Sequence, residues 1–95
     1  RIVGETGGKD FVVAHSSANP EAVATALARG AFEFQGQKCS AASRAYLPSN
    51  IAEQVKKKLL DQVANMKMGT VEDFGNFINA VIDEKAYNSI VKYIE

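Results

Sequence analysis

The chain has 95 residues, and 11 basic residues balance 11 acidic residues to give a net charge of zero. This length accommodates at most one domain, and 46% hydrophobic with 23% charged residues are ordinary proportions for a globular protein. The neutral charge argues against nucleic acid or an anionic membrane as the main partner, while a single cysteine excludes an internal disulfide and argues against a metal cage.

The first two predicted elements are a strand and a helix. A short apolar run after two glycines, residues 11–14, is typical of a buried strand. Asn19 and Pro20 have the chemistry of an N-cap and a first helical residue, and Gly36 is the predicted helix end. The apolar residues that recur at helical spacing between them are Val23, Leu27, Ala31 and Phe34.

A second strand and two further helices follow. Residues 45–47 predict the strand. Asn50 and Glu53 have the spacing of a capping box, so we expect a helix to start there and to end at Gly69. Asp83 is the predicted cap of the last helix. The apolar stripes of the two helices are Ile51, Val55, Leu59, Val63 and Met66, then Tyr87, Ile90, Val91 and Ile94.

Strands and helices therefore alternate along the chain, with residues 80–82 as a candidate third strand. Such alternation favours an α/β fold with a mainly parallel sheet. The chain opens on Arg1-Ile2-Val3, which is typical of the interior of a strand, and it closes on residues 90–95, which look like part of an amphipathic helix. We therefore expect residues 1–95 to be a single segment of a larger protein.

Residues 4–9 read GETGGK and place Glu5 among three glycines. Glycines let a backbone turn sharply or approach another group closely, so the acid can be held at a cleft rather than on a helix face. The alternative is a turn at a strand end with a solvated glutamate. The spacing is not that of a dinucleotide-binding turn, because it lacks the Gly-x-Gly-x-x-Gly pattern and does not open into a helix.

Residues 36–41 read GQKCSA and hold the only cysteine, Cys39, between the first helix and the second strand. One alternative is a buried structural cysteine, since free cysteine is among the most buried residue types. Glu5 and Cys39 lie 34 positions apart, with one predicted strand and one predicted helix between them. That unit can return the chain to one cleft, where an acid and a thiol can act as base and nucleophile.

Both stretches resemble motifs of the aldehyde dehydrogenase superfamily. The sequence GETGGKDF at 4–11 resembles its glutamate motif, and FxxxGQxCSAxS at 32–43 resembles its cysteine motif. Their order and separation match as well, and the resemblance runs through the whole chain. Residues 5–9, 15–18 and 36–41 are most similar to the members that oxidise glutamate semialdehyde, which forms from pyrroline-5-carboxylate in proline breakdown.

The resemblance implies NAD-dependent oxidation of glutamate semialdehyde to glutamate. Cys39 would be the nucleophile: it forms a thiohemiacetal with the aldehyde, and loss of a hydride to NAD leaves a thioester. Glu5 would be the general base for the water that hydrolyses this thioester. Ser40 is the candidate substrate contact, with simple packing of a small residue as the alternative. Lys38 is either a specificity residue or a partly exposed lysine.

The resemblance also implies where the segment sits. Residues 1–95 would be the start of an α/β catalytic domain that includes both motifs, and the NAD-binding domain would be largely absent. The isolated segment is therefore expected to be inactive. The implied partners are a small-molecule aldehyde and further copies of the enzyme in a homo-oligomer, with no nucleic acid, membrane or metal. The implied location is the bacterial cytoplasm or the mitochondrial matrix.

Two other functions stay open at this point. One is a different semialdehyde dehydrogenase, because the two motifs are shared across the superfamily. The other is a non-catalytic α/β structural module, against which the presence of both Glu5 and Cys39 argues. His15, the only histidine, is interpreted as a structural residue rather than a ligand or base.

Overall fold

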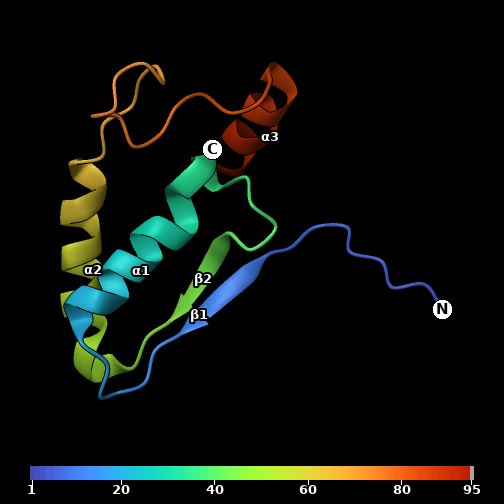
Figure 1. Ribbon diagram of the computed structural model, residues 1–95. Helices are drawn as coiled ribbons and strands as arrows, with labels where there is room; N and C mark the ends of the chain where they lie inside the picture. The colour runs from blue at the N-terminus through green and yellow to red at the C-terminus, as the bar shows by residue number, and fades with distance from the viewer. Residues whose placement is uncertain (95) are drawn as a thin grey trace.

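The computed structural model describes residues 1–94. Glu95, the end of the predicted last helix, lies outside the described residues. No helix in the described part of the chain is long and apolar enough to cross a bilayer. The elements, drawn in Figure 1, are β1 (Asp10–Val13), α1 (Pro20–Phe32), the short 3-10 helix η1 (Glu33–Gly36), β2 (Ala42–Tyr46), α2 (Ser49–Ala64) and α3 (Glu84–Ile94).

The two strands form a parallel pair, with Asp10 opposite Ala42 and Val13 opposite Tyr46. Just beyond β1, the N–H of Ala14 donates to the carbonyl of Tyr46 at 3.0 Å. Parallel neighbours need a long crossover connection, and α1 supplies it. The predicted α/β fold with parallel pairing is therefore confirmed.

Helix α1 begins where the sequence predicts. Asn19 has an extended backbone and its side-chain oxygen accepts from the N–H groups of Glu21 and Ala22, at 2.9 and 3.2 Å. Pro20 follows as the first helical residue, where its missing N–H leaves no donor unsatisfied. The local chemistry of two residues therefore fixes this boundary.

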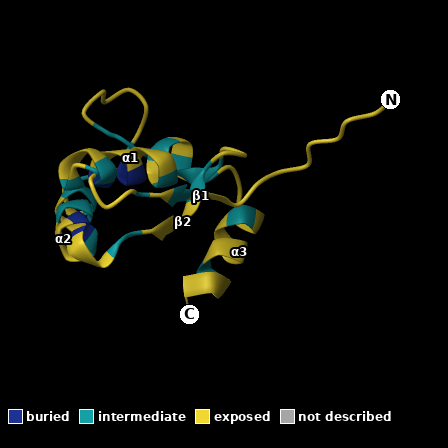
Figure 2. Cartoon of the chain, turned by 90° about the horizontal axis from the view of Figure 1, so that it is seen from below, coloured by how far each residue is buried: buried dark blue, intermediate teal, exposed yellow. Residues whose placement is uncertain are grey.

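The core lies where α1 faces α2, as the dark blue segments of Figure 2 show. Helix α1 packs between α2 and the sheet, and Val12 of β1 contacts the same cluster. Helix α3 lies outside this layer in both views, and none of its described residues is buried. The buried residues are Ala24, Leu27 and Ala28 on α1 with Ile51 and Val55 on α2.

Both predicted boundaries of α2 are wrong. The helix begins at Ser49 after Pro48, and no side chain caps it. Asn50 instead donates from its side-chain amide to the carbonyl of Ser16 at 2.9 Å, so its amide joins the loop after β1 to the helix. The helix ends at Ala64, five residues before Gly69.

The third strand is also absent among the described residues. Residues 80–82 have no regular secondary structure and no strand partner, and the nearby backbone pairing is a single bridge between Met68 and Ile78. The polar backbone groups of this segment bind side chains instead. Gln35 donates to the carbonyl of Ala80, and the N–H of Ile82 donates to Gln37.

One face of the sheet is apolar and open. Phe11 and Tyr46 are 64% and 53% exposed and lie edge to face, with ring centroids 6.0 Å apart, and Val13 beside them is 67% exposed. Parallel sheets are normally covered on both faces. This open face fits the expectation that the chain is one segment of a larger protein.

Candidate active site

The glutamate motif lies in the arm that precedes β1. Residues 1–9 have no regular secondary structure and extend away from the sheet toward the N-terminus (Figure 1). Glu5 is exposed in this arm. No hydrogen bond or ion pair joins its carboxylate to another of the described residues.

The cysteine motif forms a tight turn directly before β2. The N–H of Ala41 donates to the carbonyl of Lys38 at 3.0 Å, which closes a β-turn with Cys39 and Ser40 at its centre. Both central residues are exposed. Cys39 is therefore a reachable thiol in this chain, and its interpretation as a buried structural cysteine is wrong.

The two motifs meet through the main chain. Because Asp10 lies opposite Ala42 in a parallel pair, the residues before both strands lie at the same end of the sheet. A Cβ atom at Gly8 would lie 2.1 Å from the carbonyl oxygen of Cys39, so only glycine permits this approach. Within residues 1–94, no hydrogen bond joins Glu5 to Cys39.

The backbone that leads to Cys39 is left-handed over three residues. Phe34 has φ 55° and ψ 37°, Gln35 has φ 57° and ψ 27°, and Gly36 has φ 68°. Left-handed geometry costs an L-residue roughly 1–2 kcal/mol, so the two non-glycine residues store strain here. The prediction that Phe34 continues the apolar face of α1 is wrong, because the helix ends at Phe32.

Two glutamines hold this left-handed turn, and sequence reasoning missed both. Gln37 accepts from the N–H of Ile82 at 2.9 Å and donates to the carbonyl of Phe34 at 3.3 Å. Gln35 donates to the carbonyl of Ala80 at 3.1 Å. The signal in the sequence is a pair of glutamines around a glycine beside the lone cysteine, but their partners lie 45 positions away.

Charges beside the turn are paired with one another. Glu33 binds Lys38 at 2.6 Å and Arg29 at 2.5 Å. The hydrogen bond and charge of Lys38, together with the charge of Arg29, lower the pKa of the Glu33 carboxyl from its usual value. Lys38 is 46% exposed in this pair, which matches its interpretation as a partly exposed lysine.

The contacts of the His15 ring are with a residue two positions away, Ser17. Its Nδ1 lies 3.2 Å from the N–H of Ser17, which donates to it, and 2.8 Å from the hydroxyl of the same residue. These contacts fix the turn that leads into α1. The structural interpretation of this histidine is therefore supported by its partners.

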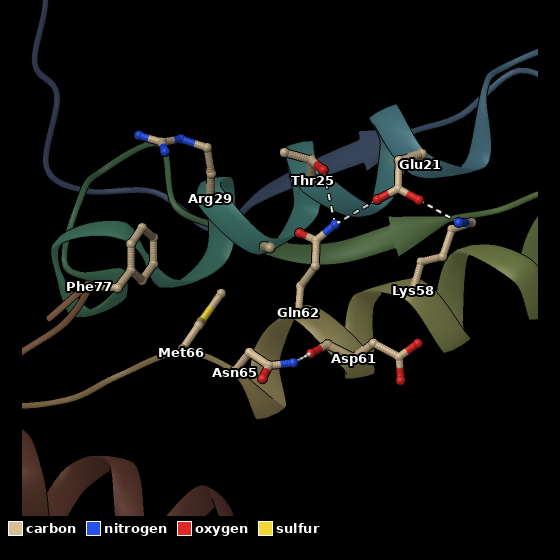
Figure 3. A pocket seen from close by; sticks show the side chains of 10 residues that line it. Glu21, Thr25, Arg29, Lys58, Asp61, Gln62, Asn65, Met66 and Phe77 are labelled. Atoms are coloured by element: carbon tan, nitrogen blue, oxygen red, sulfur yellow. Dashed lines mark hydrogen bonds and ion pairs between the residues drawn. The ribbon is translucent and has the colours of Figure 1, made fainter. Parts of the chain in front are cut away.

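A separate pocket of about 510 Å³ lies between α1 and α2 (Figure 3). Its polar side chains bind across the two helices: Lys58 pairs with Glu21 and lowers its pKa, and Gln62 donates to Thr25 at 3.0 Å. None of the candidate catalytic residues is among those that line it. The pocket therefore belongs to the helix interface rather than to the candidate active site.

Comparison with known proteins decides the family. The model of the aldehyde dehydrogenase family matches residues 1–95. The chain belongs to this family. It is 54% identical to the mitochondrial delta-1-pyrroline-5-carboxylate dehydrogenase of Dictyostelium discoideum and 47% identical to that of Homo sapiens, and both matches cover all of the chain.

The fold of the chain is also similar to a solved member of the family. The delta-pyrroline-5-carboxylate dehydrogenase from Mycobacterium tuberculosis, in a structure bound with NAD, matches 97% of the chain with a TM-score of 0.91 and 49% identity. The chain spans 17% of the length of this protein and of the two curated relatives. It therefore corresponds to a segment of these larger proteins.

Proposed function

We propose that this chain is part of an NAD-dependent pyrroline-5-carboxylate dehydrogenase, which oxidises glutamate semialdehyde to glutamate in proline catabolism. The observation that carries the proposal is the contact of Gly8 with the Cys39 carbonyl, which brings the glutamate motif and the cysteine motif to one end of the sheet. Identity of 54% over the whole chain to a curated relative of that name supports the substrate.

Cys39 is the proposed nucleophile. Its thiolate adds to the aldehyde carbon, the carbonyl π electrons move to oxygen, and the product is a thiohemiacetal bound to the enzyme. Cys39 lies at the centre of an exposed turn, which suits this role because a substrate can reach its sulfur. Ser40 is the next residue of the same turn and is proposed to contact the bound aldehyde.

Glu5 is the proposed general base for the last step. Its carboxylate takes a proton from water as the water oxygen attacks the thioester carbon, and the Cys39 thiolate leaves. The role needs the glutamate arm to fold toward the cysteine turn. Gly8 already anchors the arm against that turn, three residues from Glu5.

NAD supplies the hydride acceptor in this chemistry. The described residues do not fit a dinucleotide site of their own, because the glycine-rich stretch leads into β1 and not into a helix N-terminus. We therefore propose that residues 1–95 are the start of the catalytic domain and that the NAD-binding domain lies outside them. The isolated segment is accordingly expected to form no NADH.

The cellular setting of the whole enzyme is part of the proposal. The curated relatives from Dictyostelium discoideum and Homo sapiens carry "mitochondrial" in their names, which supports the mitochondrial matrix, with the bacterial cytoplasm as the equivalent place in bacteria. A homo-oligomer is the proposed assembly. We propose that the whole enzyme binds neither nucleic acid nor membranes.

The test is NADH formation by the full-length enzyme with glutamate semialdehyde, succinic semialdehyde and propionaldehyde. We expect a preference for the first aldehyde and no activity in the Cys39→Ala variant. Glu5→Gln should keep a first turnover of NADH and lose steady-state turnover, since only thioester hydrolysis needs the base. Glu53→Gln, an exposed glutamate on α2, is the matched control.

Each alternative has its own outcome in this experiment. Preference for succinic semialdehyde or propionaldehyde would keep the family and assign another aldehyde as substrate. Full activity of Cys39→Ala would refute the mechanism. No NADH from any aldehyde would favour a non-catalytic module.

A further inference from the structure

We propose that Gln37 is a positioning residue for Cys39: its side-chain amide clamps the left-handed turn at residues 34–36 to residues 80–82 and thereby holds the cysteine turn in its reactive position. The proposal rests on the proposed function, because that function makes Cys39 the nucleophile.

Both the oxygen and the nitrogen of the Gln37 side-chain amide form hydrogen bonds. Its oxygen accepts from the N–H of Ile82 at 2.9 Å, and its nitrogen donates to the carbonyl of Phe34 at 3.3 Å. The backbone N–H of Gln37 donates to the same carbonyl at 3.1 Å. The residue is half-buried and only one position separates it from Cys39. A single side chain thus ties the approach to the cysteine to a segment 45 positions away.

A second glutamine strengthens this connection. Gln35 donates to the carbonyl of Ala80 at 3.1 Å, while Gln37 accepts from the N–H of Ile82. The two side chains together satisfy a carbonyl and an N–H of one short segment, residues 80–82. They act on residues 80–82 as a neighbouring strand would, but with side-chain amides in place of backbone groups.

The left-handed turn needs such a clamp. Phe34 and Gln35 have φ values that L-residues disfavour, so their backbone relaxes when external contacts are lost. Gly36 adopts its φ of 68° freely, but its backbone is also tight, since a Cβ there would lie 2.8 Å from the Ala31 carbonyl. The cysteine turn begins two residues after Gly36, so relaxation of the left-handed turn displaces Cys39.

The consequence for catalysis is specific. Gly8 contacts the Cys39 carbonyl from the glutamate arm, and the clamp holds the chain that enters the cysteine turn. Loss of the clamp misplaces the sulfur relative to the aldehyde carbon. Because attack requires a near-attack geometry and displacement of about 1 Å can cost 100-fold in rate, kcat should fall while KM changes little.

The test compares two glutamine variants in the full-length enzyme. Gln37→Met keeps the length of the side chain and removes both amide hydrogen bonds. Gln62→Met is the matched control, because Gln62 also makes inter-element hydrogen bonds, but between α1 and α2. We expect Gln37→Met to lower kcat by at least about tenfold with little change in KM, and Gln62→Met to keep kcat even where it lowers the melting temperature.

A second measurement does not depend on the substrate. The rate at which iodoacetamide alkylates Cys39, followed by mass spectrometry of its peptide without aldehyde or NAD, should differ from wild type in Gln37→Met and match it in Gln62→Met. If the wild-type enzyme forms no NADH with any aldehyde, the proposed function fails, and the alkylation rates still test the clamp.

Three results would overturn the proposal. One is wild-type kcat in Gln37→Met. Another is a loss of kcat with an unchanged alkylation rate, because the thiol has then not moved. The third is an equal loss of kcat in Gln62→Met, which indicates general destabilisation. If Gln37→Met fails to fold, Gln37→Glu replaces it: the carboxylate keeps an acceptor for Ile82 and loses the donor to Phe34, so kcat should again fall below that of the control.

Discussion

Replacement of Gly8 by alanine should separate the glutamate motif from the cysteine motif. The added Cβ would lie 2.1 Å from the Cys39 carbonyl oxygen, and real Cβ contacts are essentially never shorter than 3.0 Å. The backbones must therefore separate by about 1 Å, and neither partner is a flexible side chain that can turn aside. A displacement of that size in a catalytic arrangement costs about 100-fold in rate. We expect kcat of the full-length enzyme to fall by about that factor in steady-state NADH assays.

Gly4→Ala is the matched control, since a Cβ at Gly4 has no atom within 4 Å and the change lies in the same arm. This variant should keep wild-type kcat. A Gly8→Ala enzyme with wild-type kcat would refute the argument that the arm and the cysteine turn act together. A loss shared equally by Gly4→Ala would show that the arm is sensitive to any side chain, and the contact with Cys39 would not be the cause.

Three further changes test the core, a helix cap and an ion pair. Val55→Ala empties a fully buried site and should lower the free energy of unfolding by about 2 kcal/mol in urea titrations. Asn19→Ala removes the cap of α1 and should cost about 1 kcal/mol in the same assay. Glu33→Gln should destabilise at neutral pH, because Lys38 and Arg29 hold the pKa of this carboxyl below its usual value of 4.5. That stabilisation is present above pH 4.5 and disappears as pH falls through the lowered pKa, so the stabilities of variant and wild type should converge once the pH lies below that pKa.

Each of these changes has a control in the same chain. Val71→Ala alters a valine that is 72% exposed and should leave the urea midpoint unchanged. Asn88→Ala lies on the exposed side of α3 and removes no cap. Glu53→Gln is exposed on α2 and should not change the pH dependence. Equal effects in a variant and its control would contradict the assigned cause.

Local chemistry determined what the sequence could predict. The strand predicted at residues 11–14 lies at 10–13, and α1 starts where the Asn19-Pro20 pair predicts, with the partners of the Asn19 side chain within three residues. The strand and helix predicted between Glu5 and Cys39 also led to the expectation that the chain returns to one cleft, and the parallel register places the segments before both strands at the same end of the sheet. The roles of Glu5, Cys39 and Ser40 stay predictions until the variants are measured.

Distant partners account for what the sequence could not predict. Asn50 has the spacing of a cap, but its amide binds Ser16, which lies 34 positions earlier. The left-handed turn after α1 depends on hydrogen bonds to residues 80–82, so no local sequence pattern predicts it. The same bonds occupy the backbone groups that the predicted third strand would have used. In each case one polar side chain bound a backbone group far along the chain and thereby overrode the local preference.

The open face of the sheet also has a consequence for synthesis of the protein. Phe11, Val13 and Tyr46 are exposed in the structure of residues 1–94. Until another surface packs on it, this face is accessible to whatever a nascent chain meets during synthesis. Exposed apolar sheet surface is what chaperones bind and what aggregates pair through. The time for which this face stays uncovered during synthesis therefore determines how long the segment is exposed to both.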